Sequence, residues 1–117
     1  MKNFVNNAAQ GEISIRKVDT LPDGVKPMNA EHGKFIIGHS ETGHHHTMTM
    51  ERTKVFEATT ALDGMKILYA ILEVEKVLQH ERDFDTHEPI QFQPGIYEFR
   101  LGREYDPYAE LARNAAD

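Results

Sequence analysis

Four of the seven histidines in this 117-residue chain fall within eight consecutive residues, at His39, His44, His45 and His46. The neighbouring residues favour a turn followed by a strand, in which successive side chains point to opposite faces. His44 and His46 are therefore expected on one face, with Cα atoms about 6–7 Å apart, and His45 on the other. Two imidazoles placed in this way are a natural start to a transition-metal site. The run is internal and lies between strand-like segments, so it is not an expression tag.

Three residues farther along the chain offer additional metal ligands. Glu51, five residues after the last histidine of the run, would close the site if the strand turns between them. His80 and His87 flank a polar stretch, and either one would supply a further nitrogen. The remaining histidines, His32 and His45, are interpreted as ordinary surface or hydrogen-bonded residues. The chain has no cysteine, which excludes thiolate ligands as well as disulfide bonds.

The composition argues against two classes of partner. The formal net charge is −6, from 19 acidic and 13 basic residues, and the basic residues form no dense cluster that would bind a phosphate backbone. No window approaches the roughly 18 apolar residues needed to cross a bilayer, and the first residues lack the apolar core of a signal peptide. We therefore expect no nucleic-acid partner and no membrane partner, and the cytoplasm is the expected compartment.

Short alternating or β-branched segments, separated by turn residues, occupy most of the chain. The predicted strands cover residues 11–18, 34–39, 47–50, 53–60 and 96–101. Residues 21–33 are rich in proline and glycine and are expected to form a long loop. Asp63-Gly64 is typical of a two-residue hairpin turn. The pattern predicts a single all-β domain over residues 1–117, folded as a small antiparallel barrel or sandwich.

Two segments are compatible with a helix. Residues 65–79 carry an apolar stripe at helical spacing, but an Asp-Gly turn precedes them and no capping pattern does. We expect a long strand there, bent near residues 73–75. Asp106 can cap a helix that has Pro107 in its first turn, so a short C-terminal helix or a frayed tail is expected from about residue 106.

The apolar faces of the predicted strands define an expected core. One face of each strand should be buried, because side chains alternate along a strand. The residues expected to be mostly buried are Ile13, Ile15, Phe35, Ile37, Val55, Ile67, Tyr69, Ile71, Ile96 and Phe99.

The spacing of Gly38, His44, His46 and Glu51 resembles the first motif of the cupin family, G-x5-H-x-H-x(3,4)-E. Where that motif usually ends in glycine, this chain has Ala58. Cupins are small β-barrels in which two histidines and a glutamate hold zinc, iron, manganese or nickel. The resemblance implies the same fold class, a divalent transition metal as cofactor, and both histidines and the glutamate as its ligands.

The second cupin motif has no counterpart in this chain. Pro94-Gly95 lacks the spacer that precedes it in the motif, and no histidine follows His87. A fourth ligand would therefore come from His80 or His87. The segments 42–46, 94–97 and 103–106 are also similar to small uncharacterised proteins encoded in bacterial and phage genomes, and that similarity implies no function.

Two kinds of function are compatible with these residues. The first is a small metal-binding β-barrel protein, whose metal would polarise a carbonyl or activate water if the protein acts on a small-molecule substrate. The second is a non-catalytic bacterial or phage accessory protein that contacts a protein partner, with the histidines structural or at a subunit interface. In a homo-oligomer, His44 and His46 of symmetry-related chains would meet around one ion.

Overall fold

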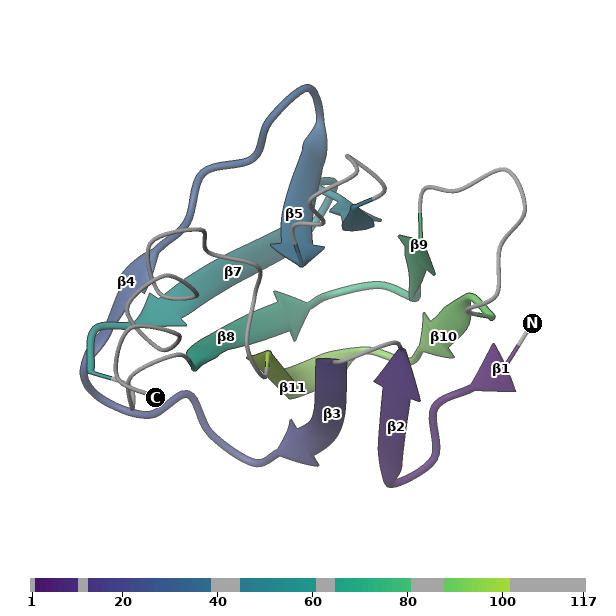
Figure 1. Ribbon diagram of the computed structural model, residues 1–117, viewed down its shortest axis with the longest axis horizontal. Helices are drawn as coiled ribbons and strands as arrows, with labels where there is room; N and C mark the ends of the chain where they lie inside the picture. Colours follow the sequence, from purple (N-terminus) through teal and green to yellow (C-terminus); the bar gives the residue numbers. More distant parts are fainter. Residues whose placement is uncertain (1, 11–12, 39–44, 61–64, 81–87, 102–117) are drawn as a thin grey trace, which may run out of the picture.

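The structure, a computed structural model, describes residues 2–10, 13–38, 45–60, 65–80 and 88–101. These segments form eleven β-strands and no helix, arranged in two sheets (Figure 1). Neither sheet closes on itself within these segments, so the architecture is sandwich-like and not a closed barrel. The predicted all-β class is confirmed. In this part of the chain, no helix is long and apolar enough to cross a membrane.

One sheet has six strands in the order β2–β3–β11–β8–β7–β4, and every neighbouring pair is antiparallel. Its central strands β8 and β11 run across the middle of the molecule (Figure 1). The strands are β2 Asn7–Gln10, β3 Ile13–Val18, β4 Val25–Pro27, β7 Thr53–Ala58, β8 Lys66–Leu72 and β11 Gly95–Leu101.

The other sheet has five strands in the order β1–β10–β9–β6–β5. Its strands are β1 Lys2–Asn3, β5 Lys34–Gly38, β6 His46–Thr49, β9 Lys76–His80 and β10 Ile90–Phe92. The short strand β1 pairs with β10 in parallel, which departs from the purely antiparallel arrangement that we predicted. The pairing is supported by backbone hydrogen bonds from Lys2 to Pro89 and from Phe4 to Gln91.

The segment 65–79 is strand and not helix, as predicted, but it is not the single long bent strand that we expected. It forms β8 and β9, which are separated by residues 73–75. β8 lies in the six-stranded sheet and β9 in the five-stranded sheet, so the break carries the chain from one layer to the other (Figure 1). The spacing of the apolar residues in this segment resembles that of a helix because β8 and β9 both bury side chains, each strand in its own sheet.

The core lies between the two sheets and draws buried residues from both. Phe35, Ile37, Met48, Leu78, Ile90 and Phe92 come from the five-stranded sheet, and Ile13, Ile15, Val55, Leu68, Ala70, Leu72, Tyr97, Phe99 and Leu101 come from the six-stranded sheet. Aromatic rings connect the layers. Phe92 packs edge-on against Tyr97 and Phe99, with ring centroids 4.8 and 5.9 Å apart. Such pairs add to the stabilisation from burial alone.

Four residues of the predicted core, Ile67, Tyr69, Ile71 and Ile96, lie instead on the outer face of the six-stranded sheet. Ile67, Ile71 and Ile96 are only partly buried there. The inward-facing residues of β8 are Leu68, Ala70 and Leu72. Both faces of β8 and β11 carry apolar side chains, so alternation alone does not reveal which face is inside. Tyr69 is buried on that outer face, and the other six residues of the predicted core are buried as well.

Two further predictions fall outside the described residues. The short C-terminal helix from about residue 106 and the Asp63-Gly64 turn lie in segments that the structure does not describe. The strands on either side of that turn, β7 and β8, are antiparallel neighbours, as a hairpin requires.

Candidate functional site

His46 is the first residue of β6 and lies on the inward side of the five-stranded sheet. It alternates with Thr47 and has the same parity as Met48, which is 1% exposed and belongs to the core. The imidazole is half-buried at the end of the strand. The strand geometry therefore places a polar, ionisable ring beside the apolar interior, where its nitrogens need defined partners.

One of these partners is Gln10, at the end of β2 in the opposite sheet. His46 Nδ1 lies 2.7 Å from Gln10 Oε1. The amide nitrogen of Gln10 donates to the carbonyl oxygens of Leu78 and Glu88, both at 3.0 Å. Gln10 is only 2% exposed, so the hydrogen bonds of its side chain are made inside the protein, where they connect the two sheets.

The Gln10 contacts determine the tautomer of the His46 ring. The two hydrogen bonds that the Gln10 amide nitrogen donates identify which end of the amide is the nitrogen. The end that faces His46 is therefore the oxygen, which can only accept a hydrogen bond. His46 Nδ1 must therefore carry a proton, and in the neutral ring the lone pair resides on Nε2. Histidines that bind metals commonly donate one ring N–H to a carbonyl or carboxylate in this way, which orients the ring and raises the basicity of the other nitrogen.

Gly38 makes room for this histidine. A Cβ atom at position 38 would lie 3.2 Å from Cδ2 of His46 and 2.8 Å from Cδ1 of Ile13. The register between β5 and β6 also shifts here, since Ile36 pairs with Thr47 and Gly38 pairs with His46. A bulge of this kind redirects nearby side chains and is frequent beside functional sites.

The backbone register pairs His46 with His80, across the antiparallel strands β6 and β9. Of the predicted ligands, His80 is the one that the fold brings next to His46. The two are 34 positions apart in the sequence, so no spacing argument links them. Their juxtaposition follows from the break after β8, which returns the chain to the five-stranded sheet beside β6.

Glu51 is not brought to His46. It lies in the turn after β6 and lines a cleft together with Thr47 and Thr49, on the outer side of the five-stranded sheet. Strand alternation places this side opposite the face that carries His46. Among the described residues, no group of three or more His, Asp or Glu side chains is positioned to hold a metal ion.

The other histidines are distributed as follows. His44 and His87 lie outside the described residues. His32 is exposed in the tight turn that closes Glu31 against Lys34, with a φ of 51°. Its exposure agrees with the prediction of an ordinary surface or hydrogen-bonded residue, and His45, just before β6, is half-buried.

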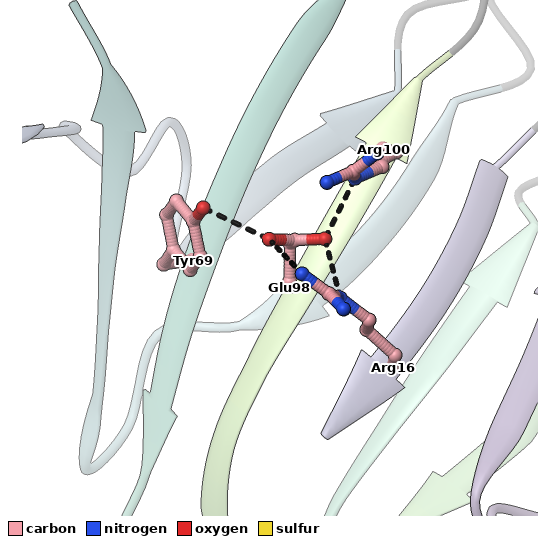
Figure 2. A network of polar contacts seen from close by, with 4 residues as sticks. All are labelled: Arg16, Tyr69, Glu98 and Arg100. Carbon is pink, nitrogen blue, oxygen red and sulfur yellow. Dashed lines mark hydrogen bonds and ion pairs between the residues drawn. The ribbon is translucent and has the colours of Figure 1, made fainter. Parts of the chain in front are cut away.

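A second polar cluster occupies the outer face of the six-stranded sheet, centred on Glu98 of β11 (Figure 2). Arg16 of β3 and Tyr69 of β8 are its cross-strand partners. Glu98 Oε1 accepts hydrogen bonds from Arg16 Nε at 2.8 Å and from Arg100 Nε at 2.7 Å, and Oε2 accepts one from the Tyr69 hydroxyl at 2.9 Å. The glutamate side chain is only 4% exposed beneath the two arginines.

These contacts determine the ionisation of the Glu98 cluster. Burial is the largest single influence on the Glu98 carboxyl and raises its pKa, but the hydrogen bonds from Arg16, Arg100 and Tyr69 together outweigh it and leave the pKa below its ordinary value. Burial, with the hydrogen bond to Glu98, raises the pKa of Tyr69. The carboxylate is saturated by these donors, so we interpret the cluster as a clamp across three strands.

Sequence reasoning missed Gln10 and Glu98. Gln10 follows Ala8 on the inward side of β2, and only the register of the folded sheets reveals that its amide reaches β9 and β6. Glu98 stands between two aromatic residues, Tyr97 and Phe99, and nothing in this spacing marks it as a buried carboxylate.

Comparisons with known proteins give one match. Residues 9–101 match a family model described as "Domain of unknown function (DUF8820)". Searches of curated proteins and of solved structures found no significant match. The matched span includes Gln10, Gly38, His46 and His80.

Proposed function

The chain belongs to the DUF8820 family, and we propose that it binds a divalent transition metal through His46 and His80. The observation that carries the proposal is the hydrogen bond between His46 and the fully committed Gln10, which assigns the lone pair of the neutral ring to Nε2. The register that sets His46 opposite His80 supports it. Residues paired directly across an antiparallel ladder have Cβ atoms about 4.5–5.5 Å apart, a separation compatible with two ligands of one ion.

A metal site needs at least one ligand more than this pair. The sequence offers His44, two positions before His46, and His87, seven positions after His80. Zinc, iron, manganese and nickel all accept imidazole nitrogen, so the ligand set alone does not select among them. Glu51 is left out of the proposed set because it lies on the outer side of the sheet.

The bound ion would connect strands β6 and β9. β6 and β9 carry the two histidines, and Gln10 connects them to the other sheet. With a coordination position open to a small molecule, the ion would polarise a carbonyl or activate water. With all positions filled by protein atoms, its contribution would be stability alone.

The second candidate function is that of a non-catalytic accessory protein in which His46 is purely structural. The same Gln10 bond favours it, since that contact joins the sheets without any ion. The two candidates differ in a single property, the retention of metal by the folded protein.

Elemental analysis of protein purified without an affinity tag tests the proposal. We expect about one transition-metal ion per chain in the wild type, and a large loss of metal from both His46→Ala and His80→Ala. His32→Asn is the matched control, because this histidine is exposed and asparagine tolerates its positive φ. Metal content near zero in the wild type, or unchanged content in both variants, would leave the structural function as the answer.

A further inference from the structure

The outer side of the five-stranded sheet carries a cleft of about 600 Å³, on the face opposite His46. Its volume is in the range of pockets that bind small molecules. The polar and charged residues that line it include Lys34, Thr47, Thr49, Glu51, Glu75 and Lys76. The proposed metal site does not share any of these side chains.

Lys76 is the unusual residue of this cleft. It is only 6% exposed, although lysine is rarely buried without a counter-charge. Its Nζ donates to Thr49 Oγ1 at 2.9 Å, and no ion pair joins it to a carboxylate within the described segments. An ammonium group has three N–H donors, so two of them are left for water or for a ligand in the cleft.

Carboxylates line the same cleft. Glu75 accepts a hydrogen bond from Gln91 at 3.0 Å, and Glu51 stands in the turn after β6. With Lys34 and Lys76, these residues give two positive and two negative formal charges around one small volume. A simple anion attracted by Lys76 would be repelled by the glutamates, whereas a molecule that carries both charges would complement both.

The remaining lining groups suit the backbone of a peptide. Thr47 is 5% exposed and lies between His46 and Met48 on the cleft side of β6, where its hydroxyl can both donate and accept. Val74 and Val77 add a small apolar surface to the wall, which suits aliphatic side chains of modest size.

We propose that this cleft binds a small zwitterion of the amino-acid type, a free amino acid or a short peptide. The carboxylate of the ligand pairs with the Lys76 ammonium, and its α-ammonium group pairs with Glu51. Thr49 holds the Lys76 side chain in position through the hydrogen bond at 2.9 Å.

The test uses trialanine as the probe and metal-free protein, so that the peptide has no ion to chelate. Calorimetric titration compares trialanine with N-acetyl-trialanine, which lacks the ammonium group, and with trialanine amide, which lacks the carboxylate. We expect trialanine to bind and each blocked peptide to bind about tenfold to a hundredfold more weakly, the usual effect of losing a hydrogen bond to a charged group.

Variants assign each end of the peptide to its residue. Lys76→Met keeps the apolar stem, and in this variant the amide should bind as well as trialanine does. In Glu51→Gln, the acetylated peptide should bind as well as trialanine. Lys54→Met, on an exposed position of the other sheet, is the matched control and should keep both preferences. Glu51 lies in an exposed turn, so its variant tests the proposal even if Lys76→Met fails to fold.

Three results would overturn the proposal. The first is that trialanine does not bind at millimolar concentration. The second is that both blocked peptides bind the wild type as tightly as trialanine does. The third is that both folded variants still prefer trialanine over the blocked peptides as strongly as the wild type does. None of these results bears on the histidine site, because the titrations contain no metal.

Discussion

Gln10 Oε1 and His46 Nδ1 lie 2.7 Å apart and connect the two sheets of the sandwich. The contact joins β2, in the six-stranded sheet, to β6, in the five-stranded sheet. Gln10 also donates to backbone carbonyls of Leu78 and Glu88. A single buried amide thus orients the histidine and satisfies two carbonyl groups.

Replacing Gln10 with alanine should destabilise the fold. The variant would leave two carbonyl oxygens and the His46 N–H without their partner, and each unsatisfied buried polar group costs about 1–3 kcal/mol. We expect the free energy of unfolding in urea to fall by about 2–4 kcal/mol, because water will replace some of these bonds. Gln79→Ala, at an exposed position of β9, should change it by less than about 0.5 kcal/mol. Equal effects of the two substitutions would contradict the role assigned to Gln10.

Gly38→Ala should destabilise the protein by crowding His46 and Ile13. The new methyl group would lie 2.8 Å from Ile13 Cδ1, which is packed in the core. Overpacking of this kind typically costs about 1–3 kcal/mol. Ile13→Val removes the crowded methyl group, so the double variant should be destabilised by less than the sum of the two single variants. Strict additivity in thermal or urea unfolding would show that the close approach is not the cause.

The sequence predicted which segments form strands better than it predicted which face of each strand is buried. Alternation and turn residues identified β3, β5, β7 and β11 and favoured strand over helix for residues 65–79. They did not reveal that Ile71 and Ile96 face outward, because the neighbouring inward positions are equally apolar. Pairing in space is a property of the assembled sheets, so neither the His46–His80 register nor the reach of Gln10 was available from spacing.

The orientation of β8 can be tested by alanine substitutions on its two sides. Leu68 is fully buried, so Leu68→Ala should cost about 2–5 kcal/mol, and Phe99→Ala on β11 about 3–5 kcal/mol. Ile71 is only partly buried, and Ile71→Ala should cost less than about 2 kcal/mol, since much of its surface stays in water. Urea unfolding of the three variants provides the comparison. A larger loss for Ile71→Ala than for Leu68→Ala would show that the strand presents its other side to the core.

The lowered pKa of Glu98 should make the free energy of unfolding depend on pH in the acidic range. Its pKa in the folded state lies below the ordinary value of 4.5, so the folded protein binds fewer protons than the unfolded chain between the two values. The stabilisation is therefore complete above about pH 4.5 and is lost as the pH falls through the folded-state pKa. Glu98→Gln should lower the free energy of unfolding by about 1–3 kcal/mol at pH 7, with a smaller difference at pH 3. A difference of the same size at both pH values would contradict an ionised clamp.

Titration of Zn²⁺ into metal-free, untagged protein tests the central claim most directly. We predict one ion bound per chain, at least a hundredfold weaker binding in His46→Ala, unchanged binding in His32→Asn, and weaker binding as the pH falls below about 6.5, where imidazoles become protonated. Gln10→Ala, which removes the acceptor for His46 Nδ1, should bind about tenfold to a hundredfold more weakly than the wild type. Binding that is absent from the wild type, or that survives intact in a folded His46→Ala protein, would contradict the assignment of His46 as a metal ligand.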